Sequence, residues 1–205
     1  MLKAKLLVEG TDDRHVILAL CGLYDVPETF NIKDSGGIKT LLKSIPVHLK
    51  ESELKALGIV LDADKSIENR WTSICAKLKQ VGYSELPKEP DEKGTIIRHE
   101  GMPDIGIWIM PNNKLSGMLE DFISYLIPDG DPLEVKASSA LTEIEAEKLN
   151  KYLSTHHQKA FIHTWLAWQE TPGQPMGLAI TAHALEHDKE IVKVFIAWLN
   201  NLFNQ

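Results

Sequence analysis

The sequence predicts an α/β protein in which helices flank a parallel sheet. In the first half of the chain, apolar runs of strand length alternate with segments whose apolar residues recur at helical spacing. This alternation is typical of parallel strands that are joined by right-handed helical crossovers. From about Asp129 onward the pattern is helical only. We therefore expect an α/β core over residues 1–128 and a helical C-terminal extension over residues 129–205, packed on the core as one compact unit.

Strands are expected at five places in the core, over residues 3–9, 30–33, 56–61, 95–98 and 105–110. The run over residues 105–110 is almost entirely apolar, which is typical of a central strand that is covered on both faces. Residues 84–94 are polar and include Pro87 and Pro90, so we expect a surface loop there.

Helices are expected after most of these strands. They begin near Thr11 or Asp12, at Ile38, at Ser66 and at Ser116, and in the C-terminal extension they cover residues 142–156, 157–169, 176–186 and 188–203. Ser66 and Ser116 are the expected capping residues of two helices. Pro46 is expected to break or kink the helix over residues 38–49.

The composition is that of a soluble globular protein without a broad basic surface. Because 43% of the 205 residues are hydrophobic, the chain can bury a full core as one domain or as one domain with an appendage. The net charge of −7 gives no support to an extensive nucleic-acid-binding face. It allows a local basic patch, and part of the acidity would belong to an acidic site.

Cysteine usage and the N-terminal residues point to the cytoplasm. Cys21 and Cys75 both stand in apolar helical contexts, so we expect reduced core cysteines in place of a disulfide or a metal site. The apolar stretch before Glu9 is too short for a signal peptide. No apolar run approaches the roughly 18 residues of a membrane span, so no membrane contact is expected.

Two of the expected strands end in pairs of carboxylates. Glu9 ends the first apolar run, and Asp13 follows it across a glycine turn. Asp62 and Asp64 close a second run, and on an extended segment two residues apart they would face the same way. Two such carboxylates repel each other unless a cation or a proton lies between them. A plainer interpretation is also open for each pair: Asp13 can complement a helix dipole, and the second pair can belong to a polar capping loop.

The combination of these acids is more informative than either pair. The carboxyl ends of parallel strands meet at one edge of a sheet, which is where α/β proteins place their sites. Glu120, with Asp121 beside it, follows the strand over residues 105–110 and can reach the same edge. Clustered carboxylates suit Mg²⁺, which prefers oxygen ligands. We therefore expect a divalent-metal site that carries phosphodiester chemistry.

The two motifs resemble a known fold. Glu9-Gly-Thr-Asp-Asp13, followed by Val-Leu-Asp62-Ala-Asp64, is similar to the Toprim fold of topoisomerases, primases, recombination-mediator proteins and nucleases. The closer likeness is to Toprim nucleases of the overcoming-lysogenisation-defect type, which use Glu-x-x-x-Asp and Asp-x-Asp. Stretches beginning at Gly106, Gly117 and Trp165 extend the likeness to a small stand-alone Toprim-like family of uncharacterised bacterial proteins, over almost the whole chain.

This resemblance implies a site and an activity. Those nucleases also use a later acid and a distant lysine, which Glu120 and Lys159 match here. Asp62, Asp64 and Glu120, with Asp13, are then expected to bind Mg²⁺ or Mn²⁺. Glu9 is expected to bind metal or to act as a general base. Lys159 is expected to stabilise charge on the phosphate. The implied partner is nucleic acid, with DNA favoured over RNA, and a homo-oligomer is open.

Two other functions are open at this point. Asp62-Ala-Asp64 also resembles the nucleophile turn of haloacid-dehalogenase-like phosphatases, in which the first aspartate attacks phosphate. That family carries the motif on its opening strand, whereas here the strand that ends at Glu9 comes first. Alternatively, the chain is a non-catalytic Toprim-like binding or regulatory module. The position of Lys159 discriminates, because catalysis gains support if this lysine points into the acid cluster.

Overall fold

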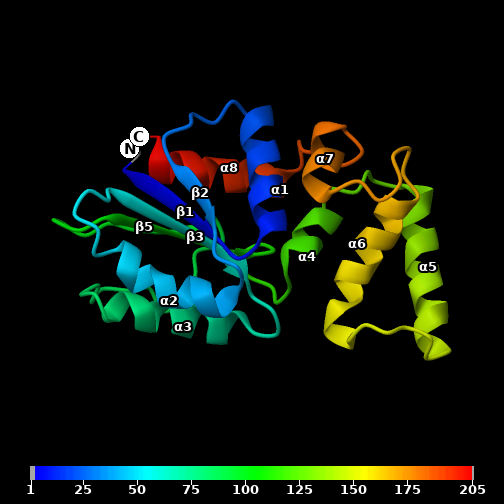
Figure 1. Cartoon of the computed structure of the whole chain (residues 1–205), viewed down its shortest axis with the longest axis horizontal. Coiled ribbons are helices and arrows are strands. Elements are labelled where there is room, and N and C mark those ends of the chain that lie inside the picture. Colours follow the sequence, from blue (N-terminus) through cyan, green and yellow to red (C-terminus); the bar gives the residue numbers. More distant parts are fainter. Residues whose placement is uncertain (1–2, 205) are drawn as a thin grey trace.

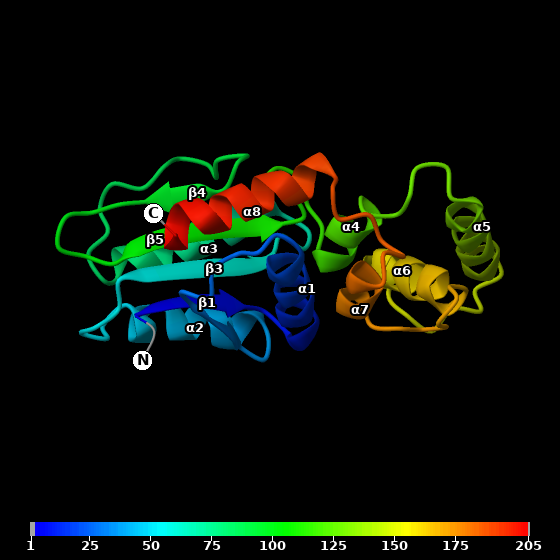
Figure 2. The same ribbon diagram turned by 90° about the horizontal axis from the view of Figure 1, so that it is seen from above.

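A five-stranded sheet organises the computed structural model, which describes residues 3–204. Its strands are β1 (Ala4–Val8), β2 (Asn31–Asp34), β3 (Ala56–Asp62), β4 (Thr95–Ile97) and β5 (Asp104–Met110). The spatial order is β2-β1-β3-β5-β4, with β2 labelled in Figure 1 and β4 in Figure 2. The predicted α/β class is confirmed, but β4 pairs antiparallel to β5. The connection over residues 98–103 explains this, because a parallel crossover needs about a dozen residues or more.

Helices connect and cover the strands. Their bounds are α1 (Thr11–Leu23), α2 (Ile38–His48), α3 (Ile67–Lys79), α4 (Leu119–Ser124), α5 (Pro132–Ala146), α6 (His157–Ala167), α7 (Met176–Thr181) and α8 (Glu190–Phe203), with a short 3₁₀ helix, η1 (Ser154–His156), before α6. Figure 2 shows α8 lying across the sheet, whereas α4, α5, α6 and α7 lie beyond the carboxyl ends of the parallel strands. The C-terminal part of the chain therefore both completes the core and borders the edge where Glu9 and Asp62 lie.

Alternate strand residues face two separate cores. Leu6, Val60 and Trp108 point to the side where α1 and α8 pack. Leu7 and Ile59 point to the opposite side, where α2 and α3 pack. The inner parallel strands β1, β3 and β5 are consequently buried on both faces, which explains their nearly continuous apolar runs, whereas the edge strand β2 has no fully buried residue.

The structure corrects one predicted helix of the C-terminal part. The helix expected over residues 142–156 instead spans Pro132–Ala146. Asp131 caps its start by accepting a hydrogen bond from the backbone N–H of Leu133, and Pro132 fits the first helical turn. Lys148 has a positive φ of 57°, which ends the helix well before residue 156.

Three helix boundaries also differ from expectation. Pro46 lies inside α2, which continues to His48, because a proline in the last turn costs only one backbone hydrogen bond. The helix start is capped at Gly10 in place of Thr11 or Asp12, and at Met118 in place of Ser116. In both helices an aspartate in the first turn reaches back to accept the backbone N–H of the capping residue.

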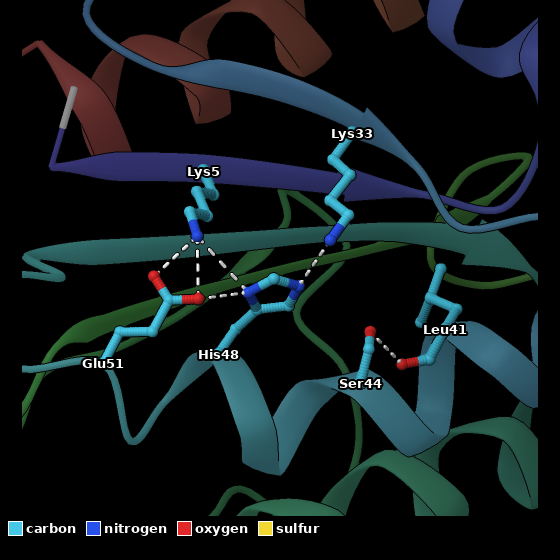
Figure 3. Close-up of polar contacts among 6 residues, drawn as sticks. All are labelled: Lys5, Lys33, Leu41, Ser44, His48 and Glu51. Atoms are coloured by element: carbon cyan, nitrogen blue, oxygen red, sulfur yellow. Dashed lines mark hydrogen bonds and ion pairs between the residues drawn. The ribbon is translucent and has the colours of Figure 1, made fainter. Parts of the chain in front are cut away.

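A buried histidine ties α2 to the sheet at the edge opposite the carboxylates. His48 is 6% exposed, and its Nδ1 lies 2.7 Å from Oε1 of Glu51. Lys5 on β1 donates to the same carboxylate at 2.6 and 2.8 Å, and Lys33 on β2 lies 3.4 Å from Nε2 of the ring (Figure 3). The imidazole is thus satisfied on both nitrogens, as burial of a polar ring requires.

Two strand glycines allow α8 to approach the sheet. A Cβ built on Gly106 would lie 2.3 Å from Cδ2 of Leu202 and 3.0 Å from Cζ2 of Trp198. A Cβ built on Gly58 would lie 2.9 Å from Cζ of Phe203. Because real Cβ contacts are longer than these, the absence of a side chain at both positions sets the depth at which α8 packs.

We expect Gly106→Ala to lower the free energy of unfolding by about 1–3 kcal/mol, because the added methyl group overpacks the contact with α8. Urea denaturation followed by circular dichroism measures this change. Gly22→Ala is the matched control, since Gly22 lies in the last turn of α1 and a Cβ there meets nothing within 4 Å. The control should be neutral or stabilising by up to about 1 kcal/mol. Equal effects of the two substitutions would contradict this packing argument.

Candidate functional site

The predicted acidic residues lie where the strand order reverses. The chain passes from β1 outward to β2 and then returns to β3 on the other side of β1. Open α/β sheets bind ligands in the crevice that this reversal leaves at the carboxyl ends of the strands. Glu9 directly follows β1 and Asp62 ends β3, so the sequence places a carboxylate on each side of that crevice.

One pocket of about 500 Å³ brings the predicted site together. Its lining includes Glu9, Gly10, Thr11, Asp12, Asp13, Gly37, Asp62, Asp64, Met118, Leu119, Glu120, His156 and Lys159. All five acids expected to bind metal line it, and so does the lysine expected to act with them. We call this cavity the acidic pocket. Residues of α4 and α6 reach it because these helices lie beyond the strand ends.

Glu9 is held at the mouth of the crevice by backbone contacts. Its Oε2 accepts a 3.4 Å hydrogen bond from the backbone N–H of Asp62, and its carbonyl oxygen accepts one of 2.8 Å from Gly37. Burial raises the pKa of the Glu9 carboxyl, and the negative charge of Asp64 raises it further. The Glu9 side chain therefore bridges two neighbouring strands at the point where they end.

Asp13 is buried and only partly satisfied. It is 6% exposed, and Oδ2 accepts a 3.0 Å hydrogen bond from the backbone N–H of Gly10. Oδ1 is buried and has no hydrogen-bond partner among the described residues. Burial raises the pKa of this carboxyl to about 7, against a smaller lowering by the Gly10 N–H. Asp13 thus caps its helix with one oxygen and leaves the other as an unmatched acceptor in the acidic pocket.

Asp62 is the acid that the others affect most. Its Oδ1 accepts a 2.9 Å hydrogen bond from the backbone N–H of Leu119, at the start of α4. Burial raises the pKa of Asp62 well above its ordinary value, and the charges of Asp13, Glu9, Glu120 and Asp64 raise it further, in that order. Every other acid of the predicted set therefore lies close enough to oppose the ionisation of Asp62.

Asp64 leaves the strand that carries Asp62. Its φ of 52° is in the left-handed region, and its backbone forms a two-way bridge with Gly117 at 2.8 and 2.9 Å. The expectation that Asp62 and Asp64 lie on one extended segment is therefore wrong, although both line the acidic pocket. Arg70 pairs with Oδ2 of Asp64 and donates to the carbonyl oxygen of Asp62 at 2.7 Å.

Lys159 reaches a buried carboxylate of the pocket from α6. Its Nζ lies 3.0 Å from Oε1 of Glu120, whose side chain is 5% exposed. Burial by itself would lower the pKa of Lys159, but the hydrogen bond and charge of Glu120 outweigh it and raise the pKa. The lysine matched by resemblance thus points at the acid cluster and lies in the pocket that contains it.

Sequence reasoning missed several residues that contribute to this region. Arg70, on the first turns of α3, neutralises Asp64, and His156 and Met118 line the acidic pocket. Arg70 carries a signal in its position, because it lies in the first turn of the helix that follows the Asp62–Asp64 pair. His156 carries none, since only the folding of η1 against the sheet edge brings it there.

The donor set suits a hard divalent cation in chemistry but does not form a finished site. Among residues 3–204, no group of three or more histidine, cysteine, aspartate or glutamate side chains is arranged to hold a metal. Each acid instead engages an internal partner, such as the Leu119 N–H, Arg70 or Lys159. The acids offer only oxygen ligands, which a hard cation prefers. A bound cation would also accept the unmatched Oδ1 of Asp13 as a ligand and would reduce the repulsion that raises the pKa of Asp13 and Asp62.

These features define an α/β protein with a carboxylate-lined pocket at the β1–β3 crevice. Within residues 3–204, no helix is long and apolar enough to cross a membrane. A family model described as "Protein of unknown function (DUF3226)" matches residues 3–204, and the chain belongs to this family. Neither the curated proteins nor the solved structures give a match to the chain.

The burial of Asp13 predicts a defined dependence of stability on pH. Because the folded pKa of about 7 lies above the unfolded value of 3.8, the unfolded chain loses this proton first. The contribution of protonated Asp13 to the stability of the fold is present below about pH 4 and is lost as the pH rises through about 7. We expect Asp13→Asn, which cannot ionise, to be more stable than the wild type at pH 8, by roughly 1–4 kcal/mol at 1.36 kcal/mol per pKa unit.

Denaturation in the presence of a chelator, from pH 4 to pH 8, measures this difference. The stability gained by Asp13→Asn should shrink towards pH 4, because Asp13 of the folded wild type is then protonated and the pH is close to the unfolded pKa of 3.8. Asp129→Asn is the matched control, because its side chain is 96% exposed and lies outside the acidic pocket. A gain for Asp13→Asn that stays constant across this range would contradict the raised pKa.

Proposed function

We propose that this protein is a divalent-metal-dependent phosphodiester hydrolase of the Toprim type that acts on nucleic acid. The convergence of the predicted acids and Lys159 in one pocket carries the proposal. These residues come from four separate parts of the chain. The pocket also occupies the crevice where α/β sheets place ligands. The resemblance of the Glu9–Asp13 and Asp62–Asp64 motifs to Toprim nucleases adds independent support.

Each side chain has a distinct role in this proposal. Asp62, Asp64 and Glu120, with Asp13, would hold Mg²⁺ or Mn²⁺. When bound, the metal supplies Lewis-acid activation of the phosphate and a more acidic bound water. Glu9 accepts a proton from the attacking water, a role suited by its raised pKa.

Lys159 is the residue proposed to stabilise negative charge in the transition state. Its ammonium group, 3.0 Å from Glu120, would contact a phosphate oxygen of a substrate in the acidic pocket. Positive charge aimed at the developing negative charge of a phosphoryl transition state accelerates transfer. The Lys159 side chain is 48% exposed, so it is accessible to such a substrate.

The proposed partner is DNA in preference to RNA, in the cytoplasm. A net charge of −7 requires that contacts with the phosphate backbone be local. Lys159 supplies positive charge in the acidic pocket, and Arg70 supplies it beside the pocket, at Asp64. A homo-oligomer is compatible with this arrangement but is not required by it, since one chain supplies all the lining residues of the acidic pocket.

The decisive experiment measures cleavage of plasmid and single-stranded DNA with Mg²⁺ or Mn²⁺. We expect cleavage that a chelator abolishes and that Asp62→Asn lowers by at least about 100-fold, because a metal ligand matters no less than its supporting contacts. Asp129→Asn should cleave like the wild type. Full activity in Asp62→Asn would sink the proposed mechanism.

A binding measurement separates a metal-dependent enzyme from a non-catalytic module. Saturating Mn²⁺ should raise the melting temperature of the wild type by about 5 °C or more, as ligand linkage to a protein of this size allows. The response should be much smaller in Asp62→Asn. A metal response and nucleic-acid binding without cleavage would instead favour the regulatory module.

We expect Lys159→Ala to lower kcat for cleavage by roughly 10²–10³-fold, the usual cost of removing one group that stabilises transition-state charge. KM should change far less, because the loss falls mainly on the transition state. Lys151→Ala, at an exposed loop position before η1, is the matched control. Steady-state kinetics on an oligonucleotide provides the readout, and an unchanged kcat in Lys159→Ala would remove this residue from the reaction.

A further inference from the structure

A second cavity opens beside the acidic pocket. It has a volume of about 680 Å³ and shares Asp64 and Met118 with the acidic pocket, as well as His156. One wall comes from the end of β3 and the start of α3, and the facing wall comes from η1 and the first turn of α6. We call this cavity the flanking groove, because a chain lying in it would continue directly into the acidic pocket.

The flanking groove differs from the acidic pocket in its chemistry. Its cationic and imidazole side chains are Lys65, Arg70, His156 and His157. Hydroxyl and amide groups make up much of the remaining lining: Ser66, Asn69, Ser73, Ser154, Thr155 and Gln158. Such groups are the usual contacts of phosphate and sugar oxygens in nucleic-acid complexes. Two carboxylates also line the groove, Asp64, which pairs with Arg70, and Asp121, which accepts the backbone N–H of Met118. No phenylalanine, tryptophan or tyrosine lines it, so stacking on the bases has little to contribute.

His157 is fixed in this wall by a partner outside the groove. Its Nδ1 lies 2.8 Å from Oε1 of Glu145 on α5, and the hydroxyl of Tyr152 donates to the same oxygen at 2.8 Å. Among the described residues Nε2 has no hydrogen-bond partner. Engagement of one ring nitrogen by a carboxylate orients the ring and leaves the other nitrogen for a ligand.

Lys65 lines the same groove and carries unneutralised charge. Within residues 3–204 it forms no ion pair, whereas Arg70 is occupied by Asp64. Lys65 also lies immediately after Asp64, so its charge is next to the boundary with the acidic pocket. An ammonium ion and an oriented imidazole in one groove are suitable contacts for the phosphates of a strand backbone.

The size of the groove limits what can enter it. A volume of about 680 Å³ lies within the range of about 300–1,000 Å³ that ligand sites occupy. A short length of a single strand fits a cavity of this volume.

We propose that the flanking groove binds the backbone of a single nucleic-acid strand next to the phosphate that enters the acidic pocket, with Lys65 and His157 as its phosphate contacts. The inference rests on the proposed function and names its substrate class. The substrate is an oligonucleotide or polynucleotide strand with at least one phosphate beyond the scissile one, not a small phosphoester. Base sequence should matter little, because the lining offers mainly backbone contacts.

The test begins with binding, measured by fluorescence anisotropy of a labelled single-stranded dodecamer in the presence of a chelator. We expect Lys65→Ala and His157→Ala each to weaken binding by roughly 5- to 10-fold, and Lys65→Ala to reduce the slope of log affinity against log salt by about 1. Lys50→Ala and His99→Ala are the matched controls, since both residues are exposed and lie away from the two cavities. The controls should bind like the wild type.

Cleavage kinetics then distinguish this inference from the proposed function. With Mn²⁺, both groove variants should raise KM for the dodecamer but leave kcat/KM for bis(4-nitrophenyl) phosphate unchanged. Groove-dependent binding without any cleavage would defeat the proposed function alone. Cleavage of the dodecamer that is indifferent to both substitutions would defeat the groove alone. The inference is also overturned if the wild type binds no single strand, or binds a duplex more tightly.

Discussion

The burial of several carboxylates beside one another at the ends of β1 and β3 is the constraint on which the rest of the site depends. Burial raises the pKa of each carboxyl, and the neighbouring negative charges raise it further, as at Asp13 and Asp62. The fold opposes this cost locally with backbone N–H groups, one from Gly10 and one from Leu119. It also places Arg70 and Lys159 beside the cluster. A site held together this way is poised to accept a cation.

The helices beyond the sheet edge have a clear part in this balance. The turn after β5 brings the start of α4 over Asp62, and the first turn of α6 brings Lys159 to Glu120. Chain segments as far apart in sequence as those of Glu9 and Lys159 thereby supply opposite charges to one pocket. The same segment of α6 continues as a wall of the flanking groove, so the arrangement that neutralises the acids also shapes the approach for a substrate.

Much of the fold could be predicted because its signals are local. Apolar runs and helical periods identified the strands and most helices. A strand that is buried on both faces of a parallel sheet has a nearly continuous apolar sequence, as the inner strands do here. The antiparallel pairing of β4 and the span of α5 were less accessible. The antiparallel pairing depends on the length of the connection between β4 and β5. The start of α5 depends on the cap at Asp131, which lies outside the residues 142–156 that the apolar pattern indicated.

The sequence by itself determined the α/β class and the placement of Glu9 and Asp62 at neighbouring strand ends, because the order of strands and acids along the chain is enough to bring them to one edge. Only the tertiary structure decided how those acids are satisfied. The positive φ of Asp64 and the contact of Lys159 with Glu120 have no periodic signal in the sequence. Charge balance between distant segments is a property of the packed chain, and local patterns do not record it.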